Sequence, residues 1–371
     1  MAQHGGVGGV GGVGGVGGVG GVGGVGGVGG GTNVTGLGAF LGADDVGGYS
    51  GVTTAGLMTT SENLLHLAGT DATPAGSHLT LNSADNNDRW ARWVRGSLYI
   101  SEFMTRVGYQ VEDGRVSGEV PSVTITVSGE PMTKLTRPSA ALLAQQCSFV
   151  QSYADLRADR GAEITSQLGF PNEYFAMVLG LHMGQHRHTF ELITATQVMA
   201  AHIAMIAKHA LAVRRPDQYD GRILPMIPTP GHGSFPSAHA TEAFAVLTVL
   251  ETLCSKWESF ADLSARLNML RGLAERISVN RTVAGVHYPI DSWAGAALGI
   301  SIGGAVLNLC GVGDHMIPDH RYTAINSDFS THLLDSDPVA HGLTTARTFN
   351  IDPGKHWTWI WQKALSDTQN V

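Results

Sequence analysis

The sequence predicts an all-α protein built as a helical bundle, with one short β-hairpin or edge strand near residues 116–135. Three observations support this fold class. The chain has 371 residues, 43% of them hydrophobic, which is enough to bury a large core in one or two domains. After Pro138 most of the chain shows helical apolar spacing between glycine or proline stops. The stretch VPSVTITVSGEP, in contrast, alternates in the manner of a strand.

The N-terminal region is of low complexity. Residues 1–45 include eight consecutive GGV triplets. Two glycines per valine and no proline exclude a collagen repeat and leave high chain entropy with little to bury. The segment also lacks the basic start and the unbroken apolar stretch of a secretory signal. We therefore predict a disordered tail over residues 1–45 and a single, mostly helical domain over 46–371, with its motif core at 189–312.

Seven segments have the apolar periodicity of helices. They span residues 88–107, 139–156, 171–183, 189–214, 238–253, 260–281 and 289–309. The uncharged stretch 292–312 is long enough to cross a membrane. However, its glycines, two serines and an asparagine are typical of close helix packing. We therefore predict a buried central helix and no membrane span.

Charge and cysteine content narrow the class of partner. A formal net charge of -8 with only 23 Lys and Arg argues against a general affinity for nucleic acid, although a local basic pocket could bind a small anion. Cys147, Cys254 and Cys310 are too widely spaced for a zinc knuckle or a complete disulfide framework, so we expect buried thiols. We expect a soluble, cytoplasmic protein, and its oligomeric state stays open, with a homo-oligomer as one option.

The first of three chemical clusters is KHALAVRRP. Lys208 and Arg215 are seven residues apart, which on an α-helix places two cations on one face. Such a pair can bind one anion from two sides. The alternative is a basic helix C-terminus that the helix dipole favours.

The second cluster is HGSFPSAH, which ends at the start of an apolar helix. Ser237 can cap this helix, and the free backbone N–H groups there favour a phosphate-like ligand. His239 would lie in the first helical turn, facing such an anion. The alternative is an ordinary serine-capped helix with an incidental histidine.

The third cluster is NRTVAGVHYPID. It contains Arg281, His287 and, four residues further on, Asp291. A carboxylate on one ring nitrogen of a histidine fixes the tautomer and leaves the other nitrogen basic. Asp291 can do this for His287. The alternative is a helix-capping aspartate beside an unrelated histidine.

Together the three clusters supply cations, helix-terminal amides and two histidines for one tetrahedral oxyanion. In their order along the chain, KHALAVRRP, PSAH and NRTVAGVHYPID resemble the signature of the type 2 phosphatidic acid phosphatase and vanadium haloperoxidase superfamily. The resemblance runs from Lys208 to Asp291 and implies an all-α bundle of that type. Two residues depart from the signature. Ala238 replaces a glycine, which would cause strain if the position needs a positive φ, and Asn280 replaces a serine.

The resemblance also implies roles for individual residues of a catalytic domain. His287 would be the nucleophile that attacks phosphorus, Asp291 would orient it, and His239 would protonate the leaving oxygen. The residues that would bind phosphate or vanadate are Lys208, Arg215, Ser237, Ala238 and Arg281. Phosphatase activity would then need no metal cation, because these groups offset the charge. In the haloperoxidase branch the cofactor would be vanadate, with vanadium bonded to His287.

Different features favour the two branches. HYPIDSWAG is similar to the phosphatases, whereas HGSFPSAH, with His232 near the pocket rim, resembles the haloperoxidases. We favour hydrolysis of phosphomonoesters through a phosphohistidine, with a phosphorylated small molecule or lipid headgroup as substrate. The alternatives are a vanadate-dependent haloperoxidase that uses halide and hydrogen peroxide, and a catalytically silent phosphate-binding scaffold.

Two further motifs stand apart from these clusters. In HMGQHRH, three histidines have a spacing that could bind a transition metal, but no carboxylate or cysteine nearby completes a site, so we expect them to be solvated. WTWIW alternates three tryptophans, for which we expect core packing rather than a lipid-surface anchor.

Overall fold

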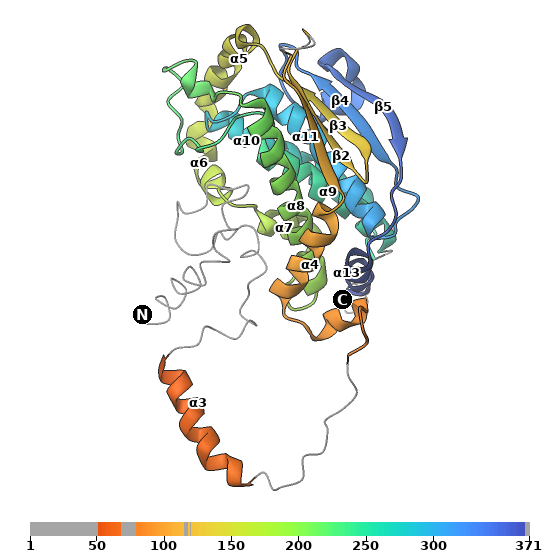
Figure 1. Ribbon diagram of the computed structural model, residues 1–371. Helices are drawn as coiled ribbons and strands as arrows, with labels where there is room; N and C mark the ends of the chain where they lie inside the picture. The colour runs from red at the N-terminus through yellow and green to blue at the C-terminus, as the bar shows by residue number, and fades with distance from the viewer. Residues whose placement is uncertain (1–50, 68–78, 115–117, 119, 258, 368–371) are drawn as a thin grey trace.

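The structure is a computed structural model that describes residues 51–67, 79–114, 118, 120–257 and 259–367 (Figure 1). The disordered tail predicted for residues 1–45 lies outside the described residues. The α-helices are α3 (Gly51–Leu64), α4 (Arg92–Met104), α5 (Ala140–Ser152), α6 (Arg157–Ser166), α7 (Asn172–Leu179), α8 (Arg187–Leu211), α9 (Ala238–Lys256), α10 (Leu263–Val283), α11 (Pro289–Leu309), α12 (Thr331–Ser336) and α13 (Lys355–Ser366). The strands are β1 (Val107–Glu112), β2 (Ser122–Val127), β3 (Glu130–Thr136), β4 (Ile317–Thr323) and β5 (Leu343–Phe349).

The prediction of an all-α bundle is wrong, because the chain also forms a five-stranded sheet in the order β1-β2-β3-β4-β5. The predicted hairpin exists as β2 and β3, joined by Ser128 and Gly129 with φ of 51° and 84°. Positive φ at both turn residues is the geometry that matches the twist of a tight hairpin. The sheet grows beyond the hairpin because β4 pairs parallel with β3, and β1 and β5 add antiparallel edges.

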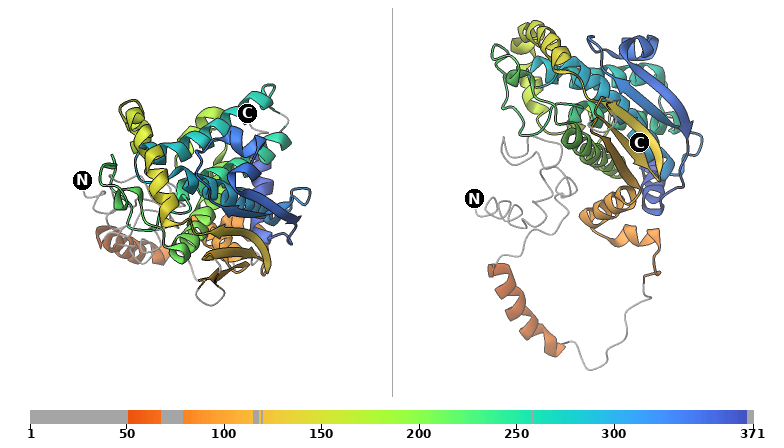
Figure 2. Two further views of the ribbon diagram at one scale, coloured as in Figure 1. Left: turned by 90° about the horizontal axis from the view of Figure 1, so that it is seen from above. Right: turned by 45° about the horizontal axis from the view of Figure 1, so that its top comes forward.

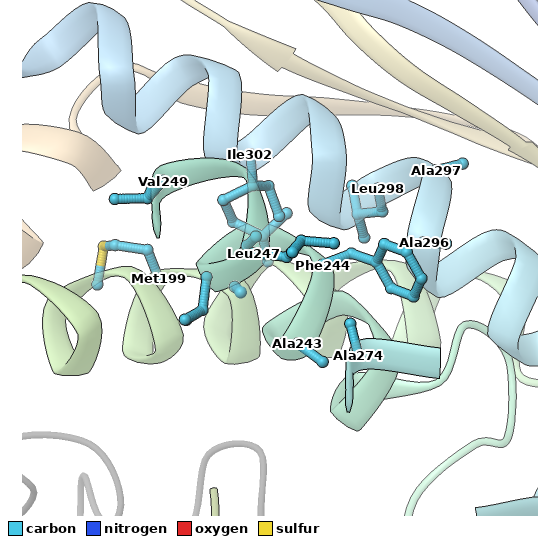
Figure 3. Packing of buried hydrophobic residues seen from close by; sticks show 14 of the residues in the cluster. Met199, Ala243, Phe244, Leu247, Val249, Ala274, Ala296, Ala297, Leu298 and Ile302 are labelled. Atoms are coloured by element: carbon cyan, nitrogen blue, oxygen red, sulfur yellow. The ribbon is translucent and has the colours of Figure 1, made fainter. Parts of the chain in front are cut away.

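The helical core is built around α11. This helix packs against α9 on one side and against β3 and β4 on the other, so it lies between the sheet and the other helices (Figures 1 and 2). Its contact with α9 depends on glycines one helical turn apart. A Cβ at Gly295 would lie 2.6 Å from Ala240 Cβ, and one at Gly299 would lie 2.5 Å from Thr241 O. The apolar side chains between the helices, Phe244 and Leu298 among them, belong to one buried hydrophobic cluster (Figure 3).

Among the described residues, two helical segments are long and apolar enough to cross a membrane by length and composition, Arg187–Gln218 and Pro289–Leu309. In their most apolar windows 83% and 94% of the residues are buried inside the fold. The central helix predicted near 292–312 is therefore buried as expected, and α8 is a second such helix that the sequence reading did not single out.

Three smaller expectations can be compared with the structure. The three cysteines are free and buried, as predicted. The WTWIW tryptophans are buried, as expected, but they lie on the helix α13 rather than on an extended segment. Of the HMGQHRH histidines, His186 is buried instead of solvated: its ring packs against Trp257, and its Nδ1 accepts a hydrogen bond from His182 N at 2.9 Å.

Candidate active site

Backbone and side-chain hydrogen bonds bring the three motif segments together. Lys208, in the last turn of α8, donates to Ser234 O at 2.8 Å, and Ser234 N donates to Val213 O at 2.8 Å. Ser237 N, at the start of α9, donates to Asp291 O at 2.9 Å in the first turn of α11. The cations of the first motif, the turn of the second and the histidine of the third therefore share one buried region.

The pair of His287 and Asp291 has the geometry of an oriented base. His287 Nδ1 lies 2.8 Å from Asp291 Oδ2, and both side chains are buried. The same carboxylate oxygen accepts from Ser234 Oγ at 2.5 Å and from Tyr288 N at 3.1 Å. Burial raises the pKa of Asp291 to about 6, against the opposing effects of Ser234 and Lys208, so the group is ionised at neutral pH. The proton of neutral His287 therefore sits on Nδ1, and Nε2 carries the lone pair.

Arg215 occupies the other side of the His287 ring. Its guanidinium is buried and donates to His287 Nε2 at 2.9 Å and to Val286 O at 2.7 Å. Burial, together with Arg215 and Lys208, holds the pKa of His287 well below its usual range, so this ring is a neutral acceptor. An anion that reaches Nε2 must replace the contact with Arg215.

His232 lies beside Arg215. Its ring Nδ1 is 3.1 Å from the guanidinium, and its backbone oxygen accepts from Arg215 Nε at 3.1 Å. Burial, Lys208 and Arg215 lower the pKa of His232 to about 4. His232 is therefore neutral. It accepts a hydrogen bond from Arg215 Nη2, whereas His287 accepts one from Arg215 Nη1.

Lys208 and Arg281 are the other two buried cations. Lys208 Nζ donates to Gly233 O at 2.9 Å as well as to Ser234 O, which leaves one of its three protons for a ligand. Burial and Arg215 lower the pKa of Lys208. Arg281 donates to Ile164 O at 3.2 Å, and its Nε has no hydrogen-bond partner among the described residues. Both cations thus retain a donor within the buried site.

His239 lies in the first turn of α9, as predicted. Its Nε2 is 2.8 Å from Gln167 O. Burial lowers the pKa of His239 to about 3, and Arg281, Lys208 and Arg215 act in the same direction. These charge effects, together with those on His287, link all three cations and both histidines electrostatically.

The two departures from the superfamily signature have different consequences. Ala238 is the first residue of α9, and it is not among the four described non-glycine residues with positive φ. Its methyl group therefore causes no backbone strain. Asn280 is fully buried, and its Nδ2 donates to Glu163 Oε1 and Gln167 Oε1, both at 2.9 Å. An amide at this position reaches groups that lie outside the motifs.

Three residues at this site were not predicted from the sequence. Ser234 holds Asp291, and Gln167 contacts both His239 and Arg281. Glu242 is buried one turn after His239, where burial raises its pKa to about 8. A carboxylate inside the apolar run ATEAFAVL was a visible signal for Glu242, and Ser234 lies within the quoted HGSFPSAH. Gln167 precedes the motifs and carries no such signal.

Two histidines, three cations and a carboxylate therefore lie together in one buried region. Residues 190–311 match the family model of the PAP2 superfamily, which confirms the resemblance inferred from the motifs.

The decaprenylphosphoryl-5-phosphoribose phosphatase of Mycobacterium tuberculosis is 26% identical over 167 residues, which cover 45% of this chain and 87% of that protein. Two solved structures are also similar. A transmembrane PAP2-type phosphatidylglycerolphosphate phosphatase from Bacillus subtilis has a TM-score of 0.35 at 19% identity and covers 44% of this chain and 84% of its own. A bacterial vanadium-dependent iodoperoxidase has a TM-score of 0.33 at 12% identity, and the match covers 43% of this chain and 46% of that one.

Proposed function

We propose that the protein hydrolyses phosphomonoesters through a phosphohistidine at His287. The observation that carries this proposal is the fixed tautomer of His287, whose Nδ1 proton is held by Asp291 while the Nε2 lone pair faces a guanidinium. Nε2 attacks phosphorus, the N–P bond forms, and the bond to the leaving oxygen breaks. His239 takes up the proton that the substrate monoanion carries and passes it to that oxygen. Water then attacks phosphorus, its proton returns to His239, and the N–P bond breaks to release phosphate.

Charge compensation in this mechanism comes from the protein. Arg215, Lys208 and Arg281 are buried cations that would bind the non-reacting oxygens, assisted by the N-terminal amides of α9 next to Ser237 and Ala238. Preorganised cations in a buried site can neutralise the negative charge on the phosphoryl oxygens, which a metal ion does in other phosphoryl-transfer enzymes. Hydrolysis should therefore persist in the presence of a chelator.

A vanadate-dependent haloperoxidase is the second candidate. The contact of His232 with Arg215 favours it, because this histidine is the residue of HGSFPSAH that resembles the haloperoxidases. His287 Nε2 and the three cations fit a bound vanadate, which would supply peroxide activation for halide oxidation. A phosphate-binding scaffold without turnover is the third candidate.

One panel of assays separates the three candidates. The purified protein is incubated with phosphomonoesters in chelator, including a prenyl phosphate and a sugar phosphate, and separately with vanadate, hydrogen peroxide and bromide. Release of phosphate supports the proposal. Halide oxidation without phosphate release would replace it with the haloperoxidase, and anion binding without either reaction would leave the scaffold.

Vanadate should inhibit the hydrolysis competitively. Vanadate and phosphate present similar tetrahedral oxygens to the same cations, and vanadate readily accepts a fifth ligand, for which His287 Nε2 is placed. We expect an inhibition constant at least about 100-fold below the KM for a simple phosphomonoester, the lower end of the range for transition-state analogues. Calorimetry on folded protein that detects no vanadate binding would contradict both catalytic candidates.

The pH dependence of kcat/KM should be bell-shaped with a maximum near pH 6. On the acid side, Asp291 with its pKa of about 6 becomes protonated and no longer supports His287. The alkaline limb comes from the substrate. His239 has a pKa of about 3 in the free site, so it carries no proton of its own near neutral pH. The proton must then arrive with the substrate monoanion, which is lost above a second phosphate pKa of about 6. We expect kcat/KM to fall about tenfold per pH unit on each side.

A change of substrate tests the assignment of the alkaline limb. A phosphomonoester with a more acidic phosphate group should move this limb to lower pH and leave the acid limb in place. An alkaline limb that does not follow the substrate would assign it to a protein group instead.

A further inference from the structure

Gln167 contacts two residues of the site from outside the three motifs. It follows α6 directly and is fully buried. Its backbone oxygen lies 2.8 Å from His239 Nε2, and its side-chain Oε1 accepts from Arg281 at 3.2 Å and from Asn280 Nδ2 at 2.9 Å. One residue therefore contacts the proposed general acid and one of the anion-binding cations.

The backbone contact determines where His239 carries its proton. A carbonyl oxygen accepts hydrogen bonds and donates none, so neutral His239 must be protonated on Nε2. Nδ1 is then the nitrogen that gains and loses a proton during turnover. The end of α6 thereby selects the atom of His239 that exchanges a proton with the substrate.

The side-chain contact orients Arg281. The guanidinium of Arg281 is buried, and its NH2 donates only to Gln167 Oε1 and Ile164 O among the described residues. Gln167 is held in turn by Asn280 and, at 3.4 Å, by Glu163. Because buried donors and acceptors lose free energy when a partner is removed, these contacts favour one orientation of Arg281.

A surface ion pair completes this network. Glu163 Oε1 accepts from Arg276 at 2.7 Å and from Asn280 Nδ2 at 2.9 Å. Asn280, the residue that departs from the superfamily signature, therefore lies between a surface pair and Gln167. A serine at this position has a single hydroxyl group and could not donate two hydrogen bonds at once.

We propose that Gln167 is a positioning residue that orients Arg281 for anion binding and fixes the Nε2 tautomer of His239, and that Asn280 acts through Gln167. The inference rests on the proposed function for its kinetic consequences, but anion binding can be measured without turnover.

The first experiment compares vanadate affinity by calorimetry in the wild type, Gln167→Met, Asn280→Ala and the double variant. Methionine keeps the length of the side chain and removes both polar atoms. We expect Gln167→Met and Asn280→Ala each to weaken vanadate binding about tenfold, the size expected for one buried hydrogen-bond partner of a charged group. The double variant should bind no more weakly than Gln167→Met, because the Asn280 side chain has no described hydrogen bond to Arg281 or His239 and reaches both through Gln167.

Asn308→Leu is the matched control. Asn308 is a buried amide that bonds Gly304 O and His315 O at the far end of α11 from Asp291. Its loss should lower Tm and leave the vanadate Kd unchanged. Wild-type affinity in Gln167→Met, or fully additive effects in the double variant, would overturn the inference. If Gln167→Met does not fold, wild-type affinity in Asn280→Ala is the result that overturns it.

The second experiment tests the tautomer directly. Nitrogen-15 NMR of the imidazole groups should show neutral His239 protonated on Nε2, with the signal assigned by its loss in His239→Gln. An Nδ1 tautomer would overturn this part of the inference. A wild type that binds vanadate but hydrolyses no phosphomonoester would instead refute the proposed function and leave the role of Gln167 in anion binding to be decided by the affinities.

Discussion

His287→Ala should reduce kcat for phosphomonoester hydrolysis by about 10⁴-fold or more, as expected when a nucleophile is removed from a group that acts as a unit. The reason is specific to its Nε2. This nitrogen carries the lone pair because Asp291 holds the Nδ1 proton at 2.8 Å, and the only other described groups bonded to Asp291 Oδ2 are Ser234 Oγ and Tyr288 N. The substitution removes this lone pair together with the imidazole ring.

The N–P bond of a phosphohistidine hydrolyses in acid. The intermediate is therefore best trapped by rapid quenching in base with a phosphorus-32 substrate. The wild type should retain label and His287→Ala should not. Thermal unfolding serves as the control for folding of the variant. Labelled His287→Ala, or turnover within tenfold of the wild type in a folded variant, would show that another residue attacks phosphorus.

The sequence predicted those parts of the fold whose pattern is local. The helix predicted at 289–309 coincides with α11, because Pro289 suits a first helical turn and the run that follows is apolar. The start of α9 was equally visible, since Ser237 caps it by accepting from Ala240 N. Local signals of this kind determine helix ends without help from the rest of the chain.

The sheet was missed because its edges carry no alternating pattern. Residues 344–348 of β5 are all exposed, so no apolar face distinguishes them from a loop. β3 and β4 pair in parallel, with Thr133 opposite His320, and this pairing joins segments on either side of the whole helical core. The helix predicted for 88–107 extended too far, because α4 ends at Met104 and β1 begins at Val107. Pairing between distant segments depends on tertiary structure, which local spacing does not record.

The candidate site shows the same division. Residues of the motifs, such as Arg215 and His287, were singled out because their chemical types and spacing suit an oxyanion. Gln167 was missed because its role depends on where α6 ends relative to α9 and α10. Asn280 was noticed as a departure, yet its partners could be named only from the packed structure.

His239→Ala should lower kcat by about 10²- to 10⁴-fold, the range for loss of a general acid. The size of the loss should depend on the substrate. An alkyl phosphate has a poor leaving group that needs a proton, whereas p-nitrophenyl phosphate has a good one. We therefore expect a large loss for the alkyl ester and a much smaller loss for the aryl ester. This dependence distinguishes proton donation from a general disturbance of the site.

His232→Ala provides the comparison, because both histidines belong to HGSFPSAH and both have lowered pKa values. The His232 side chain contributes one contact to Arg215, through Nδ1 at 3.1 Å, and the contact through its backbone oxygen survives the substitution. Its loss should change kcat/KM by less than about tenfold and affect alkyl and aryl esters equally, as expected for one hydrogen-bond partner of a charged group. His239→Ala has no such surviving contact from its ring. Equal effects of the two substitutions on both esters, measured on folded variants, would remove His239 from the proton-transfer step and leave the two histidines with the same supporting role.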